Sequence, residues 1–307
     1  MCCLFGVMDY GGSLSQKEKQ KLIGHLSVAC EVRGTDATGV AYNSGGHLRI
    51  YKRPFPAHFM RIRIPEDARI ITGHTRMATQ GDEMKNYNNH PFYGRTGTTH
   101  FALSHNGVIY NDQNLKRSEK LPATNVETDS FVAVQLLEKS GEVTGSSLGQ
   151  MAEKLHGTFT FTVLDDGDNL WFVKGDNPMC IYHYEKLGLY VYASTKEILE
   201  RGLKKTFLRT VKPEQIFMEG GDILHIDHHG HRTMERFTFH AHEPFWYRYG
   251  CYQWPALPSA KNRQLSYLDE LKDLAPIFGY DPSDIDDWRA DGYTTDEIEE
   301  LLYCGAF

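Results

Sequence analysis

The chain begins with MCCLFGVMDYGG (residues 1–12), and the run Cys3–Met8 within it is apolar and aromatic and is followed by turn residues. Such a run is typical of a buried β-strand. Runs of the same kind recur along the chain with turn residues between them, which predicts several antiparallel hairpins. The further predicted strands are Thr38–Tyr42, Leu48–Lys52, Arg69–Thr75, Phe101–His105, Thr158–Leu164, Asn169–Val173, Cys180–Tyr184, Leu187–Tyr192, Asp222–Ile226 and Glu235–Phe239.

Helical patterns interrupt these strands. The first, Gln16–Glu31, follows a candidate N-cap at Ser13 or Ser15 and gathers its apolar residues toward one side. Because the strands come in runs and the helices are set apart from them, the order predicts an α+β fold with helices packed on sheet faces. The other predicted helices are Glu127–Lys139, Ser147–Leu155 and Thr195–Arg201.

Size and charge exclude several classes of function. The 307 residues are 40% hydrophobic, which is enough for a sizeable core and for about two domains. Residues 265–307 hold twelve acidic and two basic residues, whereas the rest of the chain carries a net charge of +3. Since no strongly basic stripe is present, nucleic acids and anionic membrane surfaces are disfavoured as partners. No apolar run approaches the roughly 18 residues of a membrane span.

The composition changes after about residue 240. We expect a main domain at 1–239, an aromatic and proline-rich linker at 240–264, and a small acidic helical appendix at 265–307. The aromatic side chains of the linker need a cover, either the main domain or a partner. The helix signals of the appendix are Asp281 with Pro282, Thr294 with Glu297, the glycines Gly279 and Gly292, and the apolar stripe Ile298, Leu301 and Leu302.

The six cysteines are scattered and lack the spacing of a metal site. We therefore expect neither a metal nor a cofactor. The N-terminus also lacks the basic start and apolar stretch of a secretion signal. Both features favour a reducing cytoplasm as the location of the protein.

Cys2 is the most informative single residue. Removal of Met1 would make it the N-terminal residue, with a thiol of pKa about 8.5 and an amine of pKa about 7.7–8.0. Roughly a tenth of such an amine is free base at neutral pH, so one residue supplies a nucleophile and a proton acceptor. Because an isolated cysteine is more often a small apolar residue, the interpretation depends on the rest of the sequence.

Four further blocks support the catalytic interpretation of Cys2. With the CCLFG start, in the same order and at similar spacing, they resemble the class II glutamine amidotransferases, whose glutaminase domains are N-terminal-nucleophile (Ntn) hydrolases. The resemblance covers about residues 2–239 and implies a four-layer αββα sandwich of two antiparallel sheets between helical layers. The blocks are RGTDATGVA (33–41), GHTRMATQG (73–81), NNHPF (88–92) and SHNGVIYN (104–111).

The resemblance implies a role for each matching residue. Asn106 and Gly107 would form the oxyanion hole that stabilises the tetrahedral intermediates. Arg76 would bind the α-carboxylate of glutamine through its guanidinium, and Asp129 would bind the α-ammonium group. Taken alone, Asn-Gly is more typical of a hairpin turn, a strand-end arginine of a surface ion pair, and Asp129 of a helix cap.

The resemblance also implies roles around the nucleophile. Thr79 lies in the polar segment 77–89, which is expected to close over glutamine as a lid. Arg33 and Asp36 resemble a structural acid–base pair near Cys2. Since the amine of Cys2 would serve as the base, the motif histidines are expected to be hydrogen-bonded structural groups; they are His74, His90 and His105.

The predicted function is hydrolysis of the side-chain amide of glutamine to glutamate and ammonia through a thioester on Cys2. We expect the ammonia acceptor on a separate protein or absent, because the 68 residues after Phe239 are too few for a synthase domain. Two alternatives stay open: a hydrolase or amidase acting on another γ-glutamyl compound, and a catalytically silent module that binds an amino acid. Glutamine is the expected small-molecule partner, and the oligomeric state, including a homo-oligomer, stays open.

Overall fold

The structure, a computed structural model, describes residues 2–97 and 99–239 and, of the remainder, residues 268, 271, 272, 275, 280–293, 295 and 298. The chain divides into two compact units, Met1–Phe245 and Trp246–Phe307. The predicted linker at 240–264 lies outside the described residues, so the boundaries expected from composition stay a prediction. Five predicted helix signals also lie outside them: Gly279, Thr294, Glu297, Leu301 and Leu302.

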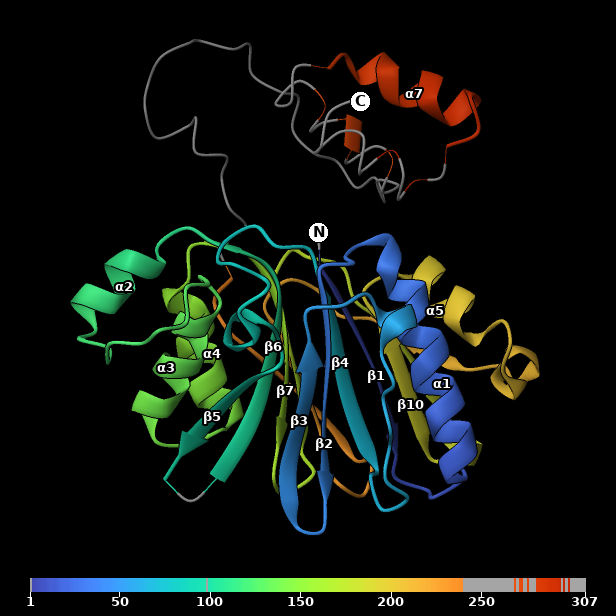
Figure 1. Ribbon diagram of the computed structural model, residues 1–307, viewed down its shortest axis with the longest axis horizontal. Coiled ribbons are helices and arrows are strands. Elements are labelled where there is room, and N and C mark those ends of the chain that lie inside the picture. The colour runs from blue at the N-terminus through green and yellow to red at the C-terminus, as the bar shows by residue number, and fades with distance from the viewer. Residues whose placement is uncertain are drawn as a thin grey trace. The chain divides into compact units, whose positions relative to one another are not determined.

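Two antiparallel sheets form the centre of the first unit (Figure 1). In residues 2–97 and 99–239, one sheet has the strand order β11-β9-β10-β1-β4-β2-β3 and the other the order β13-β12-β8-β7-β6-β5. The first comprises β1 (Cys3–Asp9), β2 (Ala37–Ser44), β3 (His47–Arg53), β4 (Ile70–Arg76), β9 (Cys180–Tyr184), β10 (Leu189–Ala193) and β11 (Glu214–Ile216). The second comprises β5 (Phe92–Thr96), β6 (Thr99–Ile109), β7 (Gly157–Asp165), β8 (Leu170–Lys174), β12 (Asp222–Ile226) and β13 (Arg232–Arg236).

Helices cover the outer face of each sheet. On the first sheet lie α1 (Gln16–Ala29) and α5 (Lys196–Leu203), and on the second lie α3 (Phe131–Ser140) and α4 (Gly145–Lys154) (Figure 1). A short helix, α2 (Asp112–Ser118), contacts α3. No helix in the described part of the chain is both long and apolar enough to cross a membrane.

Each of the three interfaces between these layers holds its own apolar cluster. Leu22 and Leu26 of α1 are buried with Val191 of the first sheet. Val132 of α3 is buried in the apolar cluster between the second sheet and the helices that cover it. Between the sheets, residues such as Leu4 from one and Phe172 from the other are fully buried. The predicted four-layer αββα sandwich of two antiparallel sheets is therefore confirmed.

Local sequence determines where α1 begins. Of the two candidate caps, Ser15 is the N-cap: its hydroxyl accepts from the backbone N–H of Glu18, and the Glu18 carboxylate accepts from the backbone N–H of Ser15. This reciprocal pair is a capping box. Ser13 instead donates its backbone N–H to the carboxylate of Asp9, 2.8 Å away, and so helps to shape the turn before the helix.

Several elements differ from the sequence prediction. β13 lies at Arg232–Arg236, three residues before the predicted Glu235–Phe239, because Phe237 and Phe239 follow the strand and pack on Phe159 with ring centroids 6.2 and 5.8 Å away. All five residues of β13 are exposed, so the strand carries little hydrophobic signal. The prediction also missed β5, β11 and α2.

The second unit has a small core of its own. Its helix α7 (Pro282–Ala290) starts at the predicted cap Asp281, whose carboxylate accepts from the backbone N–H of Ser283 at 2.9 Å. Gly292 follows the C-cap in the left-handed conformation, with φ +96°, as the sequence predicted. The buried apolar residues among those described in this unit are Leu271, Ala275, Ile285 and Ile298.

Candidate active site

Three strand ends meet at one end of the first sheet. The antiparallel register pairs Cys3 of β1 with Thr75 of β4, and Ala37 of β2 with Arg76 at the end of β4. Cys2 directly precedes β1 and is partly buried at this edge. Its sulfur accepts from the backbone N–H of Met77 at 3.4 Å. The register therefore brings Cys2 next to the residue that follows Arg76.

The RGTDATG block packs against this edge. Arg33 is buried, and its Nε donates to the carbonyl oxygen of Cys2 at 3.1 Å. Asp36 accepts from the backbone N–H of Ala78 at 2.6 Å, and its own N–H donates to the carbonyl of Arg76 at 3.0 Å. A Cβ at Gly34 would lie 2.5 Å from the carbonyl carbon of Arg76, so only glycine permits this approach. Both predicted structural residues therefore support the backbone around Cys2.

Arg76 is only 3% exposed, so it is not the surface ion-pair residue of the alternative interpretation. Its Nη1 donates to Oδ1 of Asn89 at 2.8 Å, and its Nη2 donates to the carbonyls of Gln80 at 2.6 Å and Gly81 at 3.0 Å. Burial lowers the pKa of Arg76, and the charges of Cys2, Glu83, Asp36 and Asp129 oppose that shift. The guanidinium thus ties the end of β4 to the segment that follows it.

The segment 77–89 is fastened by Glu127. The carboxylate of Glu127 accepts from the backbone N–H of Asp82 at 3.1 Å and from Nδ2 of Asn88 at 2.9 Å, and it forms an ion pair with Lys85. These partners, with Lys85 the strongest, lower the pKa of Glu127 to about 2. Thr79 is exposed on this segment. The predicted lid is therefore a defined loop, held by the carboxylates of Glu127 and Asp36 and by the guanidinium of Arg76.

Asn106 and Gly107 lie inside β6, not in a hairpin turn. Asn106 is 1% exposed; its Nδ2 donates to Oγ of Ser194 at 2.7 Å, and its carbonyl accepts from Nδ2 of Asn177 at 3.2 Å. Oγ of Ser194 also accepts from the backbone N–H of Leu4 at 2.8 Å. This chain of contacts links Asn106 to the strand that begins just after Cys2.

Asp129 is held by β6 and not by a helix. Its Oδ2 accepts from the backbone N–H of Ile109 at 2.5 Å, and the carboxylate is 3% exposed. Helix α3 starts at Phe131, four residues after the predicted Glu127, and its N-cap Ser130 makes no side-chain cap bond. The helix-cap interpretation of Asp129 is therefore wrong, and the carboxylate lies close to the Asn106–Gly107 pair along β6.

The motif histidines bridge the two sheets. Nε2 of His74 donates to the carbonyl of His105 at 3.0 Å, and the rings of His74 and His90 lie 4.2 Å apart between centroids. Burial lowers the pKa of His74 to about 3 and the pKa of His90 well below its ordinary value. His74 and His105 are hydrogen-bonded, as expected, whereas both ring nitrogens of His90 lack a hydrogen-bond partner among the described residues, so the expectation is wrong for His90. Across the described residues, no three His, Cys, Asp or Glu side chains are grouped to hold a metal.

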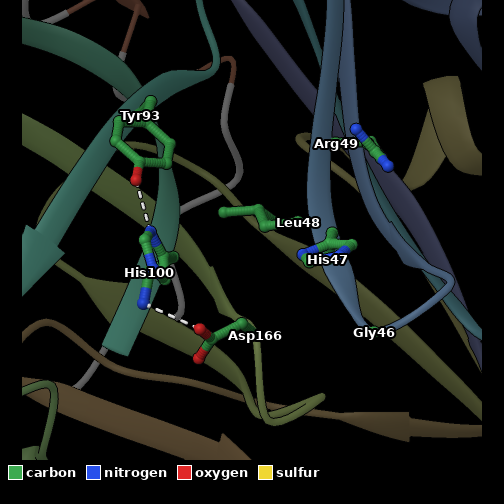
Figure 2. A pocket seen from close by; sticks show the side chains of 7 residues that line it. All are labelled: Gly46, His47, Leu48, Arg49, Tyr93, His100 and Asp166. Atoms are coloured by element: carbon green, nitrogen blue, oxygen red, sulfur yellow. Dashed lines mark hydrogen bonds between the residues drawn. The ribbon is translucent and has the colours of Figure 1, made fainter. Parts of the chain in front are cut away.

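A cleft of about 500 Å³ lies elsewhere in the fold, lined by residues 46–49, Tyr93, His100 and Asp166. Figure 2 shows the hydroxyl of Tyr93 directed at the ring of His100. The backbone N–H of His100 donates to Asp166 at 3.0 Å. Residues 46–49 start in the turn between β2 and β3. This turn follows the C-terminal end of β2, whereas Ala37, which pairs with Arg76, lies at the N-terminal end. This cleft is therefore separate from the surroundings of Cys2.

Sequence reasoning missed three residues of this region: Ser194, Asn177 and Glu127. Ser194 follows β10 and directly precedes Thr195, the N-cap of α5, so its sequence context suggests only a strand-to-helix junction. Asn177 lies in a polar turn between β8 and β9. Only Glu127 had a signal, because it stands two residues before the predicted Asp129.

Comparisons with known proteins agree with this geometry. Residues 62–237, more than half of the chain, match the family described as "Glutamine amidotransferase domain". The glutamine–fructose-6-phosphate aminotransferase [isomerizing] of Staphylococcus epidermidis is 31% identical over 191 residues, which cover 59% of this chain and 30% of that protein. The enzyme of the same name from Halobacterium salinarum is 28% identical over 203 residues, which cover 64% of this chain and 31% of that protein.

These matches span about a third of the length of the curated relatives. Among solved structures, the glutamine phosphoribosylpyrophosphate (PRPP) amidotransferase of B. subtilis, complexed with ADP and GMP, superposes with a TM-score of 0.61 at 20% identity. The superposition covers 78% of this chain and 50% of that one, and it establishes the shared Ntn-hydrolase fold. The chain therefore belongs to the glutamine amidotransferase domain family, in its class II, Ntn-hydrolase form.

Proposed function

We propose that this chain hydrolyses the side-chain amide of glutamine to glutamate and ammonia through a γ-glutamyl thioester on Cys2. The observation that carries the proposal is the convergence of three predicted site residues at one edge of the sandwich. Cys2 contacts Met77, next to the buried Arg76. Asn106 reaches the same strand, β1, through Ser194.

The protonation state of the Cys2 thiol indicates that the reaction needs a general base within the protein. Burial raises the pKa of the Cys2 thiol, and the N–H of Met77 and the charges of Arg76 and Arg33 only partly offset that increase. A thiol that is protonated at neutral pH needs a group to take its proton. The motif histidines are buried between the sheets, as neutral imidazoles. We assign this role to the α-amine of Cys2, exposed when Met1 is removed.

In the proposed reaction, a thioester forms on Cys2 and is then hydrolysed. The amine takes the thiol proton, and Sγ attacks the side-chain carbonyl carbon of glutamine to give a tetrahedral oxyanion. The side-chain amide of Asn106 and the backbone N–H of Gly107 stabilise that oxyanion. The amine returns the proton to the departing nitrogen, which leaves as ammonia. Water, activated by the same amine, attacks the thioester, and the expelled sulfur recovers a proton as glutamate forms.

Two buried charges suit the amino-acid end of glutamine. The guanidinium of Arg76 would bind the α-carboxylate in place of its present partners, the carbonyls of Gln80 and Gly81. Asp129 would bind the α-ammonium group. Because Arg76 now holds the loop that carries Thr79, arrival of the carboxylate would couple substrate binding to movement of the lid.

The ammonia acceptor is proposed to lie on a separate polypeptide. The matched relatives are named as glutamine–fructose-6-phosphate aminotransferases, and about 70% of their length lies outside the match. A pull-down with the full chain, compared with a chain cut after residue 264, tests whether the acidic residues 265–307 recruit such a partner. The same synthase-like protein recovered without those residues would exclude them as its docking site.

The central experiment measures the intact mass of the chain after incubation with an electrophilic ketone analogue of glutamine. We expect loss of Met1 and one covalent adduct, which Cys2→Ala abolishes and Cys180→Ala leaves intact. Release of ammonia is measured in parallel from glutamine and from γ-glutamyl peptides. Trimmed protein that forms no adduct and releases no ammonia would contradict the proposal, and faster hydrolysis of the peptides would favour a γ-glutamyl hydrolase.

A further inference from the structure

Ser194 lies at a junction of three segments that are distant in the sequence. It is fully buried, between the end of β10 and the N-cap Thr195 of α5. Its Oγ accepts from the backbone N–H of Leu4 at 2.8 Å and from Nδ2 of Asn106 at 2.7 Å. The hydroxyl therefore joins β1, which follows Cys2, to β6, which carries the proposed oxyanion hole.

The hydrogen bonds of this junction are incomplete. A hydroxyl offers one donor and two acceptor positions, and the two N–H groups fill both acceptor positions of Ser194. Its proton has two weak acceptors: the carbonyl of Leu4 at 3.5 Å, which already accepts the backbone N–H of Ser194 at 3.0 Å, and the sulfur of Cys3. Meanwhile, Oδ1 of Asn106 is buried with no hydrogen-bond partner among the described residues. A buried acceptor without a donor costs about 1–3 kcal/mol.

A half-turn of the Asn106 amide removes this mismatch. The two ends of a carboxamide have nearly the same shape, so the turn exchanges oxygen and nitrogen with little change in packing. Oδ1 then accepts the proton of Ser194, which still accepts from Leu4. The NH₂ group moves to the position of the unpartnered oxygen, where it can donate to a new acceptor.

We propose that Ser194 is a positioning residue for amide hydrolysis: its hydroxyl donates to Oδ1 of Asn106 and turns the NH₂ group toward the oxyanion. The inference rests on the proposed function, in which Asn106 stabilises that oxyanion. In this orientation the hydroxyl of Ser194 donates to Asn106 and still accepts from the backbone N–H of Leu4. Because it also binds Leu4, it fixes Asn106 relative to the strand that presents the nucleophile.

The main chain of Asn106 is fixed separately. Asn177 donates to the Asn106 carbonyl at 3.2 Å, and the carbonyl of Asn177 itself accepts from the hydroxyl of Thr160 at 2.7 Å. Because the backbone of Asn106 is held in this way, the motion left to this residue is rotation of its side-chain amide. The hydroxyl of Ser194, 2.7 Å from Nδ2 of Asn106, is placed to govern that rotation.

The test is Ser194→Ala, measured with glutamine as substrate. We expect kcat to fall about 10- to 100-fold with KM within about threefold, because the contact acts on the transition state; removing an oxyanion donor itself costs about 10²–10³-fold. The matched control is Thr195→Ala, which removes the neighbouring cap of α5 without touching Asn106. Should Ser194→Ala fail to fold, Ser194→Cys fills the space with a weak donor and is expected to lower kcat likewise.

A double-mutant cycle separates positioning from general support. In an Asn106→Ala background, Ser194→Ala should lower kcat no further. Three outcomes would each overturn the role of Ser194 and leave the glutaminase proposal intact. The first is a double variant whose loss of kcat is the product of the two single losses. The others are a kcat for Ser194→Ala within about twofold of the wild type, and an equal loss of kcat in Thr195→Ala. A trimmed wild-type chain that does not hydrolyse glutamine would overturn both.

Discussion

Gly107 adopts a backbone that other residues rarely reach. Its φ is +131°, and a Cβ built there would lie 1.9 Å from the carbonyl oxygen of Thr158 on the paired strand. Both the dihedral and the contact exclude a side chain at this position. A glycine is thus required beside Asn106 for steric reasons that are independent of the proposed chemistry.

We expect Gly107→Ala to lower the free energy of unfolding by about 3 kcal/mol or more, because backbone strain and a clash add together. Urea denaturation measures the change. The matched control is Gly46→Ala, where φ is +74° but no atom lies within 4 Å of the new Cβ, so only the dihedral cost of about 1 kcal/mol applies. Equal losses in the two variants would contradict the importance of the Thr158 contact.

At the residue scale, the sequence pointed to those candidate residues that lie in motif blocks. Arg76 and Asn106 stand in recognisable contexts, and the structure buries both close to the start of β1. Ser194 could not be predicted, because a serine before a helix cap has many uses and its contact with Asn106 spans 88 residues. The contact forms between the two sheets, because Ser194 follows β10 of the first sheet and Asn106 lies on β6 of the second.

At the scale of elements, the buried central strands and the edge strand β3 were predictable, whereas the short edge strands β5 and β11 and the polar helix α2 were not. β7 and β10 are buried along nearly their whole length; β10 is a continuous apolar and aromatic run, and β7 is rich in β-branched and aromatic residues. β5 alternates buried and exposed residues over only five positions and includes a glycine, so its sequence gives little strand signal. Tertiary contacts, not local propensity, also set the start of α3, because Asp129 binds β6.

The lid gives a prediction at this scale. Glu127 fastens the segment 77–89 through Asp82, Lys85 and Asn88. Since these partners lower the pKa of Glu127 to about 2, its contribution is complete above the ordinary carboxyl pKa and is lost as the pH falls toward 2. At neutral pH the anchor is therefore fully charged.

We expect Glu127→Gln to speed hydrogen exchange of the amides in 77–89 by about 3- to 10-fold, because the neutral amide loses the ion pair and one acceptor. Mass spectrometry after deuterium labelling measures it, with the amides of β1 as an internal reference. Lys85→Met, which leaves the contacts to Asp82 and Asn88 in place, should have a smaller effect. Unchanged exchange in Glu127→Gln would show that other contacts hold the lid.

At the scale of the whole molecule, three buried histidines lie where the two sheets contact each other, and their imidazole rings are neutral in the folded chain. His74 on β4 donates to the carbonyl of His105 on β6, and His90 packs on His74 and Phe92. Burial lowers the pKa of all three imidazoles in the folded chain. In the unfolded chain each would titrate near its ordinary pKa of about 6.5. Below that pH the unfolded state binds more protons, so stability is lost as the pH falls from about 6.5 toward about 3 for His74.

Each such histidine contributes a slope of about 1.4 kcal/mol per pH unit, so three give at most about 4 kcal/mol per pH unit in this window. Urea denaturation between pH 7.5 and pH 5 measures the slope. We expect His90→Leu to reduce it by about a third, since both ring nitrogens of His90 lack a partner among the described residues and no hydrogen bond is lost. Phe92→Leu, which loosens the same packing without a titrating group, should lower stability and leave the slope unchanged. A His90→Leu chain with the wild-type slope would mean that His90 does not resist protonation in the folded sandwich, and the pH dependence would then belong to other groups.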